Sequence, residues 1–340
     1  MKRLHILNVV SNLDKPMINK KSILIILSLI FIYACKERQE TAETDRDNWW
    51  LWTADWNPNN DHISVGGTQD TLRLFSSESY QLVENIPLRG TITKTKWHPI
   101  KNKLAISMQN EKSKSLILDP ISKEQIVLDS LDESGARAIG WNNKGELLAV
   151  GDYSGFLIIY NESGGIIKRI NTKQKGLIGL DWHPEKNIIT VVGERISIYN
   201  FENDSIYDIK PRKEDVLMLC VAWNPNGEFF VTGDYGDFEK DYPPLLQFWS
   251  ASGENLRNID KSKAEFRNLK WSKDGKILAT ASESLRLWNE NGDLLIESES
   301  RNLLWGIDWN KLDSKIVTTD EKGKIIIWDR ELNQIQELKY

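Results

Sequence analysis

The sequence predicts an all-β fold, a seven-bladed β-propeller of four-stranded blades, and three observations carry that prediction. A tryptophan-centred motif recurs every 38 to 48 residues, a period typical of propeller blades. Short β-branched and aromatic runs, bounded by Gly, Asn, Asp or Ser, follow each copy as strands do. No segment keeps the 3.6-residue apolar spacing of a helix over a dozen residues. The 340 residues can therefore form one repetitive domain rather than two unrelated ones.

The first strand of each predicted blade carries the repeated tryptophan, which we expect to fill the slot between neighbouring blades. These seven anchors are Trp56, Trp97, Trp141, Trp182, Trp223, Trp271 and Trp309. Each is followed by an apolar run such as "LLAVGD", a polar turn, a run such as "FLIIY" and a further short strand such as "GIIKRIN". A single blade has two apolar faces and cannot stand alone, so seven of them must close into a ring.

The third predicted strands give a family resemblance. Runs such as "SLRLW" and "KIIIW" place Trp249, Trp288 and Trp328 where the WD40-repeat family has a tryptophan, and the chain resembles that family over residues 48–340. The resemblance implies a seven-bladed propeller. The family's Gly-His pair is missing throughout, and its turn aspartate is matched only by Asp70. The hydrogen-bonded tetrad of the family is therefore not carried over.

The two ends of the predicted ring suggest how it closes. The chain enters on a first strand, "WWLWTADW", and leaves on a fourth strand, "NQIQELKY". This predicts seven complete consecutive blades with no exchanged strand. The residues before four anchors are Lys270, Asp308, Asp55 and Lys96 on blades 6, 7, 1 and 2. We expect them to form charge pairs near the channel; the alternative is that they are solvated.

The N-terminal segment has the pattern of an export signal. Two lysines precede an apolar run from Ile23 to Ala34 that is too short for a transmembrane helix. The residues before Cys35 resemble the lipobox of bacterial lipoproteins, which implies cleavage before Cys35 and lipidation of its thiol, with palmitate among the attached chains. We therefore expect a signal peptide over residues 1–34 and a flexible tether over 35–47. A plain signal or anchor is the alternative, and residues 1–16 are interpreted as an extension caused by a misassigned start.

Charge and cysteine content restrict the partners. The formal charge of −5 becomes −9 after loss of residues 1–34, and no basic run appears, so no nucleic-acid partner is expected. With Cys35 lipidated, Cys220 has no partner for a disulfide. We expect it to act as a small buried hydrophobe.

Two groups of residues are candidates for binding a protein or peptide partner. The long loop within "GDYGDFEKDYPPLLQFW" holds Tyr235, Phe238 and Tyr242, and exposed loop aromatics favour recognition. Its acids lack the spacing of a calcium loop, and an ordinary solvated loop is the alternative. The second group lies four residues before the anchors and comprises Trp52, Arg267 and Trp305. These share strand parity with the anchors, so they could instead cap the core. Trp49 and Trp50 either seal the ring or meet a partner.

The sequence favours a non-catalytic protein-interaction scaffold, lipid-anchored on the bacterial cell envelope. No catalytic residues, metal ligands or cofactors are expected: His98 and His183 are interpreted as turn residues, and no triad or phosphate-binding loop is visible. One alternative is a propeller enzyme or small-ligand-binding protein that uses the central channel. Another is a subunit of an envelope assembly complex, by fold-level analogy.

Overall fold

The computed structural model describes residues 49–59, 61–109, 114–129, 131–298 and 302–340. The predicted signal peptide, Cys35 and the tether lie outside these residues. Within them, no helix is long and apolar enough to cross a membrane. The propeller forms one compact unit from Asn48 to Tyr340.

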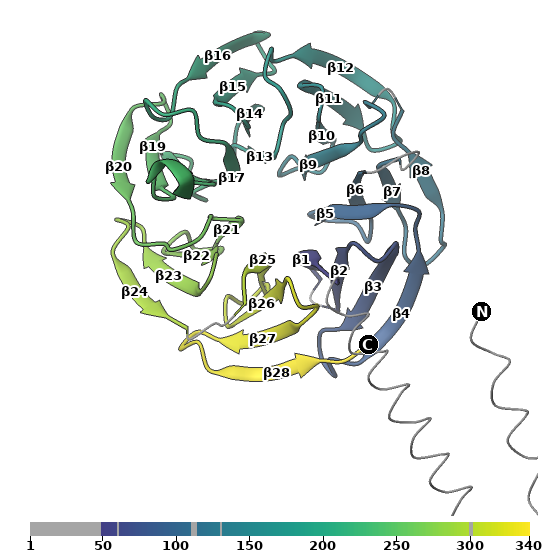
Figure 1. Cartoon of the computed structure of the whole chain (residues 1–340). Helices are drawn as coiled ribbons and strands as arrows, with labels where there is room; N and C mark the ends of the chain where they lie inside the picture. Colours follow the sequence, from purple (N-terminus) through teal and green to yellow (C-terminus); the bar gives the residue numbers. More distant parts are fainter. Residues whose placement is uncertain (1–48, 60, 110–113, 130, 299–301) are drawn as a thin grey trace, which may run out of the picture. The chain divides into compact units, whose positions relative to one another are not determined.

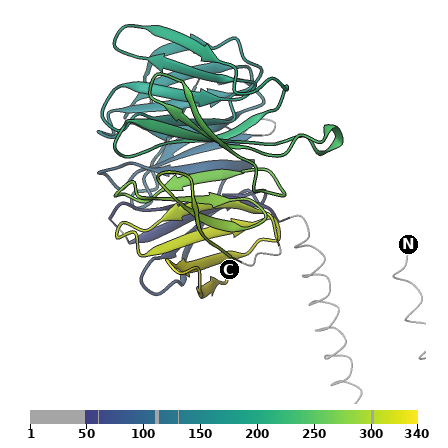
Figure 2. The same ribbon diagram turned by 90° about the vertical axis from the view of Figure 1, so that its left-hand side faces the viewer.

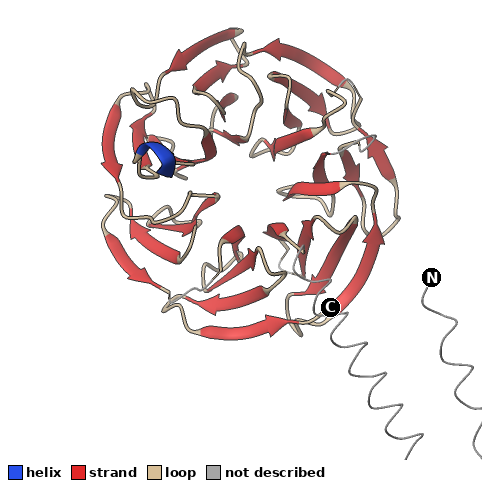
Figure 3. Ribbon diagram, viewed as in Figure 1, coloured by secondary structure: helices blue, strands red, loops and turns tan. Residues whose placement is uncertain are grey.

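Seven four-stranded antiparallel sheets surround a central channel (Figures 1 and 3). Blades 1 to 4 consist of β1 (Leu51–Trp56), β2 (His62–Gly67), β3 (Thr71–Ser76), β4 (Leu82–Pro87); β5 (Thr91–Trp97), β6 (Leu104–Gln109), β7 (Leu116–Leu118), β8 (Gln125–Val127); β9 (Ala136–Trp141), β10 (Leu147–Asp152), β11 (Phe156–Asn161), β12 (Ile166–Asn171); and β13 (Gly179–Trp182), β14 (Ile188–Val192), β15 (Ile196–Asn200), β16 (Ser205–Ile209).

Blades 5 to 7 consist of β17 (Met218–Trp223), β18 (Phe229–Asp234), β19 (Leu246–Ser250), β20 (Asn255–Ile259); β21 (Asn268–Trp271), β22 (Ile277–Ala281), β23 (Leu285–Asn289), β24 (Leu294–Glu297); and β25 (Leu304–Trp309), β26 (Lys315–Asp320), β27 (Ile325–Asp329), β28 (Gln334–Leu338). Each blade uses four consecutive strands in order, from the channel outward. The predicted fold, including seven blades with no exchanged strand, is confirmed.

The core lies between neighbouring blades. In the cluster between blades 1 and 2, for example, Leu72 and Leu74 pack with Trp97, Leu104 and other apolar residues. All seven anchors are buried. An indole buries about 150–250 Å², which at about 25 cal/mol per Å² contributes roughly 4–6 kcal/mol before entropy costs. The anchors therefore join the blades, as predicted.

Four anchor indoles also hydrogen-bond to the preceding blade. Trp223 Nε1 donates to the Thr190 hydroxyl oxygen at 3.0 Å, and the other three donate to a backbone carbonyl. Trp97 Nε1 donates to the Asp55 carbonyl at 3.1 Å. Trp182 Nε1 donates to the Gly140 carbonyl at 2.8 Å, and Trp309 Nε1 donates to the Lys270 carbonyl at 3.2 Å. Each of these three carbonyls lies just before the anchor of the preceding blade, so these bonds fix the register of one innermost strand against the next.

The ring closes by packing of blade 7 on blade 1. Asp308 Oδ2 accepts the backbone N–H of Trp56 at 2.7 Å, and the Thr319 hydroxyl donates to the Leu51 carbonyl at 2.8 Å. The ring of Trp49 stacks on Tyr340 with centroids 6.1 Å apart. Trp49 therefore helps to seal the ring.

The two histidines that follow anchors are turn residues, as expected. His98 Nδ1 accepts the N–H groups of Ile100 at 3.1 Å and Lys101 at 2.9 Å, and His183 Nδ1 makes the equivalent pair of bonds. Burial lowers the pKa of both imidazoles. Nδ1 can accept these hydrogen bonds only when it carries no proton, and a lowered pKa favours that neutral imidazole.

The turn between the second and third strands uses more aspartates than the sequence comparison found. Besides Asp70, whose carboxylate accepts the Gly90 N–H at 3.2 Å, the buried Asp152, Asp234 and Asp320 end the second strands of blades 3, 5 and 7. One oxygen of each accepts two N–H groups of the following turn or loop at 2.8–3.0 Å. These three aspartates hold the turn from the last position of the second strand, whereas Asp70 lies three residues after the end of β2, so matching the position of Asp70 in the sequence does not find them.

Candidate functional site

One face of the disc carries the long loop of blade 5. The loop connects β18 to β19, includes the short 3-10 helix η2 (Phe238–Lys240), and projects beyond the disc (Figure 2). Its base is fixed because Arg212 forms an ion pair with the buried Asp234 at 3.1 Å and donates to the Pro243 carbonyl at 3.0 Å. The loop therefore projects from the disc with its base anchored to the propeller through Arg212.

Near the start of several innermost strands, on this same face, the pairing with the second strand shifts by one residue. In β1 the partners of Leu51 and Thr53 are the adjacent Gly67 and Gly66, which leaves Trp52 unpaired. Shifts of the same kind occur at Arg137 in β9 and between Leu304 and Ile307 in β25. Because a β-bulge redirects a side chain, strand parity does not hold at these positions.

The side chains at these three shifts meet two others at the mouth of the channel. We call the five residues the mouth cluster: Trp52, Arg137, Tyr235, Arg267 and Trp305. The rings of Trp52 and Trp305 stack with centroids 4.9 Å apart. The guanidinium of Arg267 lies 4.0 Å from the Trp305 ring centroid and 5.7 Å from that of Tyr235. The guanidinium of Arg137 lies 5.1 Å from the Trp52 centroid. Blades 1, 3, 5, 6 and 7 thus contribute to one surface.

The two arginines of the mouth cluster differ in their partners. Arg267 forms an ion pair with Glu265, whose side chain is largely buried. Among the described residues, no carboxylate lies within ion-pair distance of Arg137. Burial lowers the pKa of Arg137 to about 10; the nearby Tyr153 opposes this shift and the positive charge of Arg267 adds to it. At neutral pH, Arg137 is therefore a partly desolvated cation without an acidic partner.

The structure brings the two predicted groups together only in part. Tyr235, 45% exposed, joins Trp52, Arg267 and Trp305. Tyr242 instead lies beside Arg212, whose guanidinium is 5.8 Å from the Tyr242 ring centroid. Phe238 is 58% exposed. Trp50 is 40% exposed and lies beside Trp305, with centroids 5.6 Å apart, so it extends the same surface.

The sequence does not single out Arg137, because blade 3 is not adjacent to blade 1. It reaches Trp52 across blade 2, where the corresponding residue is the small Thr93. The usable signal was the residue type: an arginine four positions before an anchor, as at Arg267. The seven first strands converge on one narrow channel mouth, so side chains from blades that are not adjacent, such as Arg137 and Trp52, can still meet there.

The channel contains the predicted charge pairs. Lys96 Nζ lies 2.8 Å from Asp55 Oδ1, and Lys270 Nζ lies 2.8 Å from Asp308 Oδ1. The second oxygen of each aspartate accepts the anchor N–H of the next blade, Trp97 for Asp55 and Trp56 for Asp308, both at 2.7 Å. Each aspartate therefore also provides a hydrogen-bond acceptor for a backbone N–H at the channel-facing edge of the next blade's innermost strand.

The described residues do not provide a metal or thiolate centre. No group of three His, Cys, Asp or Glu side chains there could hold a metal ion. Cys220 is buried, and burial raises the pKa of its thiol to about 12, so it remains protonated and unreactive.

Comparison with known proteins agrees with this architecture. A model of the eukaryotic translation initiation factor eIF2A family matches residues 152–312. The human U3 small nucleolar RNA-associated protein 4 homolog is 21% identical over 216 residues, which cover 58% of this chain and 30% of the relative. The chain thus spans about a third of that relative's length. Together with the seven blades, these similarities support assignment of the chain as a WD40-like propeller.

Proposed function

We propose that this protein is a non-catalytic interaction scaffold that captures an acidic peptide segment of a partner protein on the mouth cluster. The observation that carries the proposal is Arg137, a cation without an acidic partner among the described residues, beside stacked indoles. Arginine binds a carboxylate with two parallel hydrogen bonds. Tryptophan, tyrosine and arginine are the types most enriched at the centres of protein interfaces.

The surroundings of the mouth cluster fit a peptide better than a small molecule. Trp50 and Tyr235 are exposed there, and Leu217, whose carbonyl accepts the Tyr235 N–H at 2.9 Å, is 37% exposed. Phe238 is exposed on the β18–β19 loop. The β18–β19 loop provides a raised edge against which an extended segment can lie. An acidic side chain on Arg137 and an apolar side chain against the loop aromatics would together give specificity.

Peptide display against residues 48–340 tests the proposal directly. Enriched peptides should carry Asp or Glu beside an apolar residue. A selected peptide should bind at least tenfold more weakly to Arg137→Gln, which corresponds to about 1.4 kcal/mol. Arg330→Gln is the matched control, because Arg330 is exposed on blade 7 outside the cluster. Peptides without acids, or equal affinity for Arg137→Gln and the wild type, would refute the proposal.

The loop aromatics contribute separately. Replacement of Tyr235 by alanine should weaken peptide binding more than replacement of Phe238 or Tyr242, because only Tyr235 is placed within the cluster. An equal effect of all three replacements would indicate that the whole loop, and not the channel mouth, is the contact surface.

We further propose that Cys35 is lipidated and holds the propeller on the bacterial cell envelope. Support comes from the order of basic, apolar and small residues before Cys35. Replacement of Cys35 by serine should move the protein from the membrane fraction to the soluble fraction, and mass spectrometry should detect acyl chains on Cys35 in the wild type. An unmodified Cys35 would contradict the anchor. A place within an envelope assembly complex remains a second proposal, which co-purification from solubilised membranes tests.

A further inference from the structure

A second region, separate from the mouth cluster, lies at the other end of the channel. A cavity of about 520 Å³ extends from Lys94 inside the channel to the turns that follow the anchors, and an adjoining cavity of about 430 Å³ shares Lys270, Lys273 and Lys311 with it. The turns after the anchors lie on the face opposite to the β18–β19 loop, because each innermost strand crosses the disc. The larger volume falls within the range of small-molecule sites, about 300–1,000 Å³.

Five lysines and two aspartates line the larger cavity. Two of the lysines, Lys96 and Lys270, already have carboxylate partners at 2.8 Å. Burial lowers the pKa of Lys270, but the charges of Asp308 and Asp55 more than offset this, so its pKa is raised. The positive charges of these two ammonium groups are therefore neutralised by carboxylates of the protein itself.

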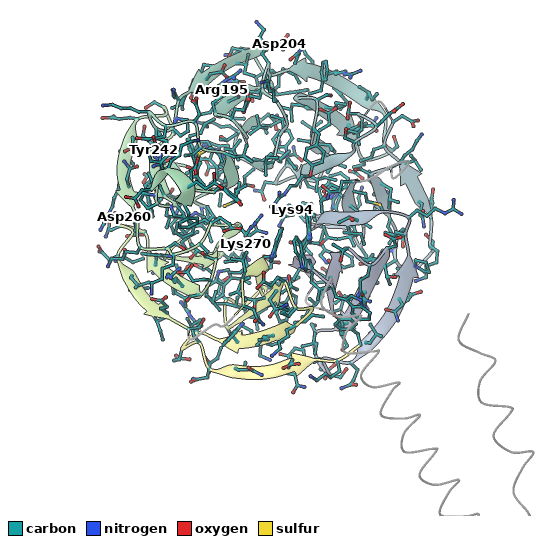
Figure 4. All side chains as sticks on the ribbon, viewed as in Figure 1. Lys94, Arg195, Asp204, Tyr242, Asp260 and Lys270 are labelled. Atoms are coloured by element: carbon teal, nitrogen blue, oxygen red, sulfur yellow. The ribbon has the colours of Figure 1, made fainter. Side chains whose placement is uncertain are left out.

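Lys94 is different. It projects from β5 of blade 2 into the channel (Figure 4), and its Nζ lies 3.4 Å from Oδ1 of Asn268 on blade 6. Among the described residues, no carboxylate lies within ion-pair distance of it. Burial and the neighbouring charge of Lys96 lower the pKa of Lys94 to about 8, against the weaker opposing effects of Cys220, Asp181 and Asp55. Most Lys94 side chains are still charged at pH 7.

The two aspartates of the cavity are engaged by the backbone. Asp181 accepts the N–H groups of Trp182 at 3.0 Å and Trp223 at 2.8 Å. Asp313 accepts the Lys273 N–H at 2.9 Å through each oxygen. The side chains of Lys273 and Lys311, both exposed residues at the cavity mouth, form no ion pair within the described part of the chain.

Lys94, Lys273 and Lys311 thus supply three ammonium groups that extend from the channel to the surface. A lysine ammonium is a point charge that suits phosphate oxygens, and several separated ammonium groups suit more than one phosphate. We propose that this cavity binds a small molecule that carries at least two phosphate groups. The inference is independent of the peptide surface, which lies on the other face.

Calorimetric titration of the propeller with inorganic pyrophosphate at pH 7 and low salt tests this proposal. Saturable binding is expected, with affinity at least tenfold lower for Lys94→Gln. Lys144→Gln is the matched control, since Lys144 is exposed on the same face but does not line the cavity. Binding that is absent up to millimolar pyrophosphate, or unchanged in Lys94→Gln, would overturn the proposal.

A second variant guards against a folding defect in Lys94→Gln. The double variant Lys273→Gln, Lys311→Gln changes only exposed side chains and should bind pyrophosphate several-fold more weakly; unchanged binding would contradict the proposed site. Arg137→Gln should bind pyrophosphate as the wild type does, which separates this inference from the peptide proposal. Citrate that binds as tightly as pyrophosphate would overturn the assignment to phosphate.

Discussion

At the scale of single residues, the channel lysines show how burial and pairing oppose each other. Lys270 is half-buried beside Asp308 and keeps its charge, whereas Lys94 is half-buried without a carboxylate and its pKa falls to about 8. Desolvation without a compensating charge costs folding free energy. Lys94 lines the cavity and carries this unfavourable desolvation energy, so we infer that its role is ligand binding and not support of the fold.

Replacement of Lys94 by methionine should therefore stabilise the protein at neutral pH. We expect the free energy of unfolding at pH 7 to rise by about 1–3 kcal/mol. The pKa of Lys94 is lower in the folded chain than in the unfolded chain, so the wild type gains stability as pH rises from about 8 towards 10.5. The advantage of the variant should shrink over that range in urea unfolding experiments. A constant difference between pH 7 and 9.5 would contradict a lowered pKa.

Asp308 should show the opposite behaviour. Replacement by alanine leaves the Trp56 N–H without its acceptor and Lys270 without its counter-charge. Loss of one partner costs about 3–5 kcal/mol when both charges are buried, and we expect a smaller loss here because the Lys270 side chain is 38% exposed. Asp308→Asn keeps an acceptor for Trp56 and should lose less stability. Measurement of thermal unfolding for both variants checks this order, and equal losses would mean that the backbone bond adds little.

At the scale of strands, the period of tryptophans predicted the blades correctly but could not predict the bulges. Parity placed Trp52 on the same side as Trp56, and a single extra residue at Trp52 reversed that conclusion. A bulge leaves little trace in sequence, because it depends on which N–H and C=O groups pair across two strands. The predicted contact between Trp52 and Trp305 survived because ring closure alone brings blades 7 and 1 together.

The bulge of β25 also explains a glycine at the seam. A Cβ on Gly306 would lie 2.4 Å from Thr319 Oγ1 and 2.5 Å from the Ala54 nitrogen of blade 1. Gly306→Val should therefore force blades 7 and 1 apart and lower the free energy of unfolding by about 1–3 kcal/mol or more. Differential scanning calorimetry measures this effect. Gly165→Val, in an exposed turn of blade 3 where the nearest atoms to an added Cβ belong to the Asn161 side chain, is the control and should lose less.

At the scale of the whole molecule, seven blades give two faces with different chemistry around one channel. The face in Figure 1 has stacked indoles, two arginines and the projecting loop. The opposite face has a cavity lined by lysines. The blade count and strand order were predictable because they repeat along the chain. The composition of each face was not, since Arg137, Tyr235 and Arg267 meet only after the ring has closed.

The most direct test of this account is the affinity of a display-selected acidic peptide for the wild-type propeller and for Arg137→Gln, measured by fluorescence anisotropy. The account predicts at least a tenfold loss for Arg137→Gln, and a similar loss when the peptide's acid is changed to its amide. It also predicts no further loss when the two changes are combined, because they remove the same contact. Additive losses, or full affinity for Arg137→Gln, would contradict the assignment of the channel mouth as the capture surface.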